Sequence, residues 1–103
     1  TLFLNQITTY ITGQSPFAVL VADVNNDLKP DIVAASCDTN TVGVFLNKGD
    51  GTFFNQVSYA TGSQPRTVDV ADINSDGKSD IIVANSGDNT VGVLLNGGNG
   101  TFP

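Results

Sequence analysis

The stretch DINSDGKSDIIV, residues 72–83, decides the fold of this chain. Acidic and amide side chains recur in it with the spacing D-x-N-x-D-x-x-x-D, and an apolar run rich in β-branched residues follows directly. Closely spaced Asp, Asn and Gly favour tight loops, whereas β-branched residues favour strands. The stretch therefore predicts a polar loop that curls around its own side chains and leads into a buried β-strand.

The same pattern occurs once more, as DVNNDLKPDIVA at residues 23–34. An offset of 49 residues aligns Tyr10–Phe53 with Tyr59–Phe102, and 25 of the 44 aligned positions are identical. Self-similarity at a fixed spacing of this size is typical of repeat architectures. The chain is therefore expected to contain two copies of one structural unit.

Each copy divides into short β-type runs separated by turn residues. The Asp50-Gly51 and Asn99-Gly100 dipeptides favour the positive φ of tight hairpins between the third and fourth runs. The N-terminal residues resemble the fourth run of the first copy, so the chain is predicted to begin with a fourth strand. Strands are expected at residues 17–22, 32–36, 42–46 and 53–60, and again at 66–71, 81–85 and 91–95.

This order predicts an all-β fold, a β-propeller with two four-stranded blades per chain. Residues 1–12 would supply strand 4 to complete a blade, residues 13–61 form the first blade, and residues 62–103 give strands 1–3 of the second. Two blades cannot cover each other's outer faces, and propellers need roughly 4–8 blades. We therefore expect a homo-oligomer that closes a ring, with a six-bladed trimer favoured and an eight-bladed tetramer as the second choice. An excised piece of a longer propeller is the alternative.

The two polar loops carry the spacing of a metal site. When such a loop curls, side-chain oxygens at positions 1, 3, 5 and 9 converge, and the backbone carbonyl at position 7 can join them. An all-oxygen shell of this size suits Ca²⁺, which takes 6–8 oxygen ligands, and we expect two ions per chain. The alternative is a pair of polar turns held by Asx-type hydrogen bonds. The candidate ligands are Asp23, Asn25, Asp27, Lys29 and Asp31 in the first loop, and Asp72, Asn74, Asp76, Lys78 and Asp80 in the second.

An EF-hand shares the opening spacing of these loops but needs a bidentate Glu at position 12. That position holds Ala34 and Val83, neither of which can bind a metal. The loops also differ at position 6, where a left-handed turn favours glycine: the second loop has Gly77 and the first has Leu28. We therefore predict that the Asp23 site binds Ca²⁺ more weakly than the Asp72 site.

Composition excludes several functional classes. The net charge of −6 leaves no basic surface for nucleic acid or for an anionic membrane, and no apolar run is long enough to span a bilayer. The sequence has no His and no Glu, and Cys37 is its single cysteine. A Ser-His-Asp or Cys-His catalytic arrangement is therefore impossible, so we expect no enzyme and interpret Cys37 as a buried structural residue.

A second group of polar residues falls in the turns on the side of each blade opposite the calcium loops. Such side chains can bind sugar hydroxyls, although ordinary solvated turns use the same residue types. A binding role here competes with a purely structural unit that has no ligand of its own. The candidates are Gln14, Ser15, Asp38, Asn40, Gln64, Arg66, Asp88 and Asn89.

The strand, the D-x-N-x-D-x-x-x-D loop and the later V-G-V-x-L-N-x-G-x-G-T-F motif together resemble the FG-GAP/VCBS repeat over almost the whole chain. This resemblance implies integrin-α-like propeller blades with calcium between strands 1 and 2. It further implies a secreted, extracellular protein with a lectin-like or adhesion role and carbohydrate or an extracellular protein as partner. The positions that match the family's ligands are Asp23, Asn25, Asp27 and Asp31, with Asp72, Asn74, Asp76 and Asp80.

Overall fold

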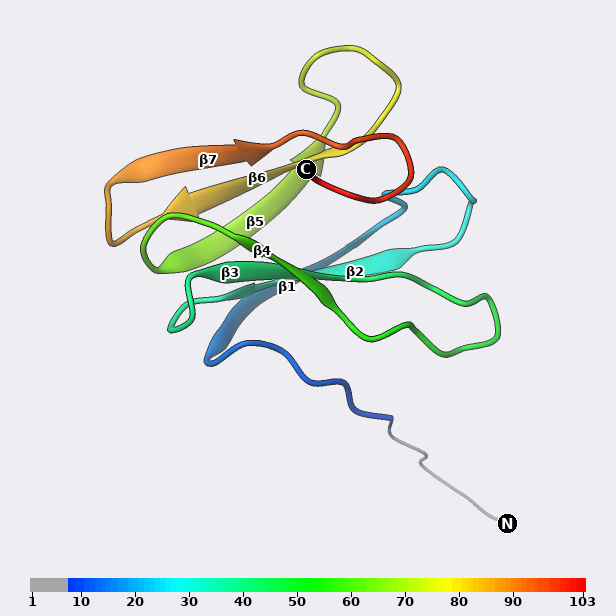
Figure 1. Ribbon diagram of the computed structural model, residues 1–103, viewed down its shortest axis with the longest axis horizontal. Coiled ribbons are helices and arrows are strands. Elements are labelled where there is room, and N and C mark those ends of the chain that lie inside the picture. The colour runs from blue at the N-terminus through cyan, green and yellow to red at the C-terminus, as the bar shows by residue number, and fades with distance from the viewer. Residues whose placement is uncertain (1–7) are drawn as a thin grey trace.

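The computed structural model describes residues 8–103 and contains two antiparallel β-sheets, shown in Figure 1. Within these residues there is no helix, and so none that could cross a membrane. The predicted all-β class is thereby confirmed. The first sheet has the order β1-β2-β3-β4, with β1 (Pro16–Ala22), β2 (Asp31–Ser36), β3 (Thr41–Phe45) and β4 (Val57–Ala60). The second has the order β5-β6-β7, with β5 (Pro65–Ala71), β6 (Asp80–Asn85) and β7 (Thr90–Leu94).

Both sheets have two apolar faces, because their central strands are apolar at consecutive positions. Paired residues of an antiparallel ladder point to the same side, so the register assigns each side chain to a face. We call the side of the first sheet that carries Leu20, Val33 and Val44 its face A. The equivalent side of the second sheet carries Asp69, Ile82 and Val93 and is also called face A. Face B is the opposite side, with Val19, Val21 and Ile32 in the first sheet and Val68, Val70 and Ile81 in the second.

The core lies between face A of the first sheet and face B of the second. Val33, Val42 and Val44 from the first sheet form one buried cluster with Ile81 and Val83 from the second. Leu20, Val68 and Val70 pack against this cluster from the two strands β1 and β5. The two copies of the repeat therefore meet through different faces, and within residues 8–103 no sheet packs on face B of the first sheet or on face A of the second.

The fourth strand of the first sheet is shorter than expected, because β4 begins at Val57 and not at residue 53. Phe53 makes an isolated bridge to Asn47, and the backbone N–H of Asn47 donates to the Asp31 carboxylate at 2.8 Å. The bridge is held by the Phe54 N–H to Leu46 O and the Lys48 N–H to Thr52 O, so the Asn47 N–H points away from Phe53 and is free to reach Asp31. The next pair toward β4 is Val44 with Val57, so between the two pairs one strand has one residue more than the other. This register shift, a β-bulge, interrupts the ladder between the hairpin tip and β4.

Tyr10 has the same relation to the first sheet as Tyr59 has to the second. The Tyr10 and Phe53 rings meet edge to face at 5.8 Å, and the rings of Tyr59 and Phe102 do so at 5.5 Å. Tyr59 belongs to β4, the last strand of the preceding unit. Residues 8–12 form no strand here, and the rest of the strand expected at residues 1–12 lies outside the described residues, so that assignment stays a prediction.

Candidate metal centres

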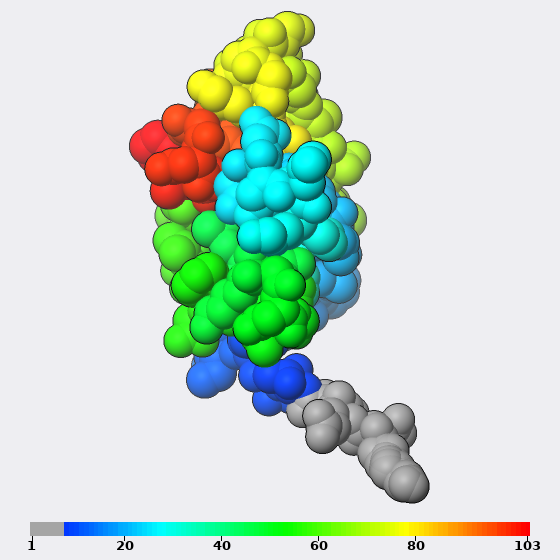
Figure 2. Space-filling view, turned by 90° about the vertical axis from the view of Figure 1, so that its right-hand side faces the viewer, coloured from blue at the N-terminus to red at the C-terminus, as the bar shows by residue number. Residues whose placement is uncertain are grey.

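The two acidic loops lie between β1 and β2 and between β5 and β6, next to one another on the side of the molecule seen in Figure 2. In the first loop, carboxylate oxygens of Asp23, Asp27 and Asp31 all lie within 4.8 Å of one another. The same holds for Asp72, Asp76 and Asp80 in the second. Three carboxylates this close repel one another, and a bound cation offsets that repulsion. Each loop can therefore hold a metal ion.

The first carboxylate of each loop organises the turn. Asp23 accepts backbone N–H groups of Asn25, Asp27 and Leu28, the last at 2.8 Å. Asp72 likewise accepts the Asp76 and Gly77 N–H groups at 3.1 and 2.8 Å. The loop curls inward because positions 4 and 6 have positive φ, at 58° and 64° for Asn26 and Leu28 and at 59° and 81° for Ser75 and Gly77.

The last carboxylate of each loop joins the loop to the rest of its sheet. Asp31 is fully buried and accepts the Val24 N–H at 2.9 Å and the Asn47 N–H at 2.8 Å, one on each oxygen. Asp80 is also fully buried and accepts the N–H groups of Ile73 and Asn96 at 2.9 and 2.8 Å. These two Asp residues therefore have a structural role in addition to their place in the acidic cluster.

The carboxylates differ in how readily they take up a proton. Burial raises the pKa of Asp31, the nearby Asp27 and Asp23 charges add to the rise, and the Asn47 and Val24 N–H groups only partly offset it. Burial also acts to raise the pKa of Asp23, but its backbone N–H donors, Leu28 foremost, outweigh this and lower it. The Gly77 N–H is the main cause of the lowered pKa of Asp72. In the first loop the buried Asp31 carboxylate is therefore stabilised by a proton or a cation, whereas Asp23 keeps its negative charge to lower pH.

The amide at position 3 shows that the loops fit a cation. In the first loop, Asn25 Oδ1 is buried and has no hydrogen-bond partner within the described residues. In the second loop, Asn74 Oδ1 lies 3.0 Å from one oxygen of Asp76 and 3.3 Å from the nearest oxygen of Asp72, so acceptor faces acceptor. A reversed Asn74 amide would donate its N–H groups to these oxygens instead. A cation among the oxygens satisfies both amides as they stand.

Of the predicted ligands, the structure brings together the three Asp residues of each loop and places the Asn oxygen of the second loop beside them. The backbone N–H groups of Lys29 and Lys78 donate to the carboxylates of Asp27 and Asp76, both at 3.0 Å, and these bonds fix the backbone at position 7 of each loop. Their alkyl chains lie against Gly49 and Gly98 in the hairpin of the same sheet. The proposed role of the two Lys carbonyl oxygens as ligands stays a prediction.

The first loop is covered by the second sheet, whereas the second loop is open. Asn96, which follows β7, donates through its side-chain nitrogen to Val24 O at 2.6 Å and to Ser79 O at 2.8 Å. Val24 is 2% exposed, but its equivalent in the second loop, Ile73, is 53% exposed. The equivalent of Asn96 is Asn47, which donates to Pro30 O at 2.7 Å within its own sheet. Sequence reasoning did not assign a role to these two Asn residues, although both occur in the repeated Leu-Asn pair.

The candidate ligand residues in the opposite turns do lie near one another, but many of their polar atoms are already paired. Asp38 accepts from the Ser15 hydroxyl, and its N–H donates to Gln14 O. Asn40 Oδ1 accepts the Gln64 N–H at 2.9 Å. Asp88 accepts the Ser63 N–H at 2.7 Å, Arg66 lies over the Phe17 ring at 5.2 Å, and Asn89 has a positive φ of 57°. Most of these residues therefore have a structural use in the turns.

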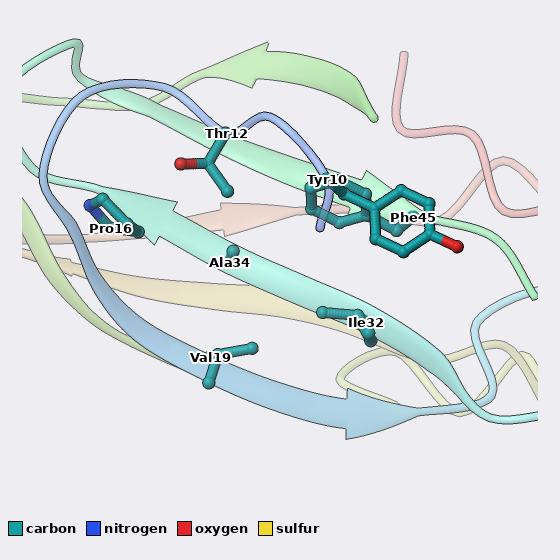
Figure 3. Close-up of a pocket in the computed structure, with 7 residues that line it drawn as sticks. All are labelled: Tyr10, Thr12, Pro16, Val19, Ile32, Ala34 and Phe45. Carbon is teal, nitrogen blue, oxygen red and sulfur yellow. The ribbon is translucent and has the colours of Figure 1, made fainter. Parts of the chain in front are cut away.

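An apolar hollow of about 250 Å³ lies on face B of the first sheet and is shown in Figure 3. Tyr10, Val19, Ile32 and Phe45 contribute to its lining, and the hydroxyl of Thr12 lies at its edge. The equivalent positions in the second sheet include Val68 and Ile81, which are part of the core or pack against it. Cys37 does not line this hollow. It is a free thiol directly after β2 and is 4% exposed, so it lies in a buried position as expected from the sequence.

These features agree with the comparison to known families. The FG-GAP-like repeat model matches residues 23–83, from the first carboxylate of the first loop to the strand after the second. The match covers more than half of the chain, which therefore belongs to the FG-GAP repeat family. Searches against curated proteins and against solved structures found no match.

Proposed function

We propose that the chain is a calcium-binding module of an extracellular β-propeller, with a lectin-like or adhesion role and no enzymatic activity. The observation that carries the proposal is the pair of loops in which three carboxylates lie within 4.8 Å of one another. The buried, unpartnered Asn25 Oδ1 supports a cation in the first loop. Hard oxygen donors without His or Cys favour Ca²⁺ over transition metals, and the flexible multi-oxygen shell favours it over Mg²⁺.

Isothermal titration of the metal-free chain with CaCl₂ and MgCl₂ tests the metal. We expect two Ca²⁺ ions per chain and much weaker binding of Mg²⁺. Asp27→Asn should weaken the first site and Asp76→Asn the second, because each removes a carboxylate from one cluster. Asp50→Asn is the charge-matched control, since the second copy of the repeat has Asn99 at this position. Absence of Ca²⁺ binding, or equal loss in the control, contradicts the proposed metal.

The ligand of the proposed adhesion role is an extracellular carbohydrate or protein, and the module would repeat its site around a ring of blades. Repetition of weak sites increases overall avidity without new contacts. A glycan array probed in calcium and again in chelator tests this role. Calcium-dependent binding that is lost in a Gln14→Ala/Gln64→Ala double variant supports it, and an array without signal in either condition contradicts the carbohydrate.

The alternative is a structural unit without a ligand, and the pairing within the turns favours it. Asp38, Asn40 and Asp88 already accept hydrogen bonds from neighbouring turns, so these side chains have a use without any sugar. For either role we propose that the chain assembles with itself, with a six-bladed trimer favoured over an eight-bladed tetramer. The mass in solution separates these ring sizes.

A further inference from the structure

We propose that the open face A of the second sheet is the docking surface for face B of the first sheet in a second copy of this chain. We further infer that Asn47 of that copy completes the second metal loop, an inference that rests on the proposed metal function. The contact between the two sheets of one chain, in which face A of the first packs on face B of the second, is the template for this docking. The same rotation and translation that relates the first sheet to the second, applied once more, places the first sheet of another copy on face A of the second sheet.

Matched positions of the repeat show how much apolar surface the open face leaves uncovered. Val42 and Val44 on face A of the first sheet are 0% and 2% exposed. Their equivalents on the second sheet, Val91 and Val93, are 68% and 49% exposed. Burial of such side chains contributes roughly 25 cal/mol per Å² of apolar surface. The difference arises because the first sheet packs against the second on this face, whereas no part of residues 8–103 packs on this face of the second sheet.

The other half of the joint is open at the opposite end of the chain. Val68 and Val70 on face B of the second sheet are half-buried against the first sheet, whereas their equivalents Val19 and Val21 are 67% and 65% exposed. The hollow in Figure 3 belongs to this open face B. One chain therefore presents both complementary surfaces of a joint that it already makes internally, which favours a second copy as the occupant.

The open edge of β7 supplies the register of the contact. In the first sheet Thr41 pairs with Ala60 and Val42 with Tyr59. The equivalent pairs place Ile11 of a second copy opposite Thr90 and Tyr10 of that copy opposite Val91. Ile11 is 86% exposed in the isolated chain, and Tyr10 already packs on Phe53 as Tyr59 does on Phe102.

The same step links the docked copy to the second metal loop. Asn96 donates to Val24 O in the first loop, so the equivalent contact is from Asn47 of the second copy to Ile73 O. Gly100 packs closely on the first loop, where an added Cβ would lie 3.1 Å from that of Asn25. Its equivalent Gly51 has open space around it. The second loop is therefore completed only when a copy docks.

Solution mass of the full chain in calcium, measured by sedimentation over a wide concentration range, tests the docking surface. We expect a multiple of the 10.7 kDa chain mass. Val93→Asp should weaken association by at least about tenfold, because it places a charge in an apolar contact. Asn99→Asp is the control with the same added charge, and it copies Asp50 of the first sheet.

A substitution at Asp69 should have the opposite effect on association. Asp69 stands on open face A where the first sheet has Leu20, which packs against the core. Asp69→Leu should therefore strengthen association. A chain that stays monomeric at every concentration, or a mass that responds equally to Val93→Asp and Asn99→Asp, overturns the proposal.

Cross-linking tests the register without depending on the metal. Ile11→Cys and Thr90→Cys are combined with Cys37→Ser, which copies Ser86 and leaves no other thiol. On oxidation we expect a ladder of covalent multimers, whereas each single cysteine can form dimers at most. Failure to form the ladder overturns the docking contact even if calcium binds.

Calcium titration at low and high protein concentration tests the link to the second loop. Asp76→Asn should remove the part of the calcium affinity that rises with concentration, and Asp27→Asn should leave that part in place. Calcium affinity that does not change on assembly overturns the role of Asn47, and absence of calcium binding in any condition contradicts the proposed function instead.

Discussion

The side-chain nitrogen of Asn96 lies 2.6 Å from the carbonyl oxygen of Val24, and this hydrogen bond ties the second sheet to the first acidic loop. The contact joins residues that are far apart in the sequence, and both are almost fully buried. It shows that the first acidic loop is part of the joint between the sheets. Metal binding there and packing of the two sheets are therefore expected to depend on each other.

Asn96→Asp tests this contact. The aspartate keeps the acceptor for the Gly98 N–H but places a carboxylate against the carbonyl oxygens of Val24 and Ser79. We expect a loss of roughly 3 kcal/mol in the free energy of unfolding, because the second oxygen of the buried carboxylate has no donor and faces two carbonyl oxygens. Asn47→Asp, which loses the single bond to Pro30 O, should cost about 1 kcal/mol. Urea unfolding of both variants at low protein concentration measures the difference, and equal losses would contradict the role of Asn96.

Asp31→Asn should destabilise the chain even when the metal is removed. The Asp31 carboxylate accepts one backbone N–H on each oxygen, and an amide has only one oxygen to offer. One N–H then faces an NH₂ group, at a cost of about 1–3 kcal/mol. Asp27→Asn is the control, because its amide oxygen can still accept the Lys29 N–H. Unfolding in excess EDTA should separate the two variants. If both unfold like the unaltered chain, the structural role of Asp31 is wrong.

Leu28 makes the first loop harder to form than the second. It has φ 64° and is 93% exposed, so no packing compensates a left-handed conformation that costs roughly 1–2 kcal/mol for a side chain other than glycine. Leu28→Asn should raise the calcium affinity of the first site several-fold, because Asn tolerates this conformation better. Gly77→Leu should lower that of the second site. Calorimetry on each variant measures both effects, and an unchanged first site would point to the Asn96 contact as the dominant influence.

Much of the fold and of the acidic loops could be predicted from the sequence because both depend on local patterns. The spacing of Asp23, Asp27 and Asp31 defines a loop whatever surrounds it, and the structure does bring these carboxylates together. The structural hydrogen bonds of Asn96 and Asp31 could not be predicted, because their partners are backbone groups that only the fold brings near. The shorter β4 could not be predicted either, because it follows from a one-residue register shift between the Asn47–Phe53 bridge and the Val44–Val57 pair.

The stability gained from calcium should fall as the pH falls, because a proton competes with the metal at Asp31. The native state raises the pKa of Asp31 above the ordinary 3.8, so protonation of this group favours the native metal-free protein. Asp23 and Asp72 act in the opposite sense, since their lowered pKa values give stability above pH 3.8 that is lost only at lower pH. Melting temperatures in calcium and in EDTA, from about pH 7 to about pH 4, should therefore converge before the acid unfolding of either sample. In an Asp31→Asn variant this convergence should be weaker, because the competing proton site is gone. A calcium-induced increment that stays constant down to acid unfolding would show that the buried carboxylate does not bind the ion.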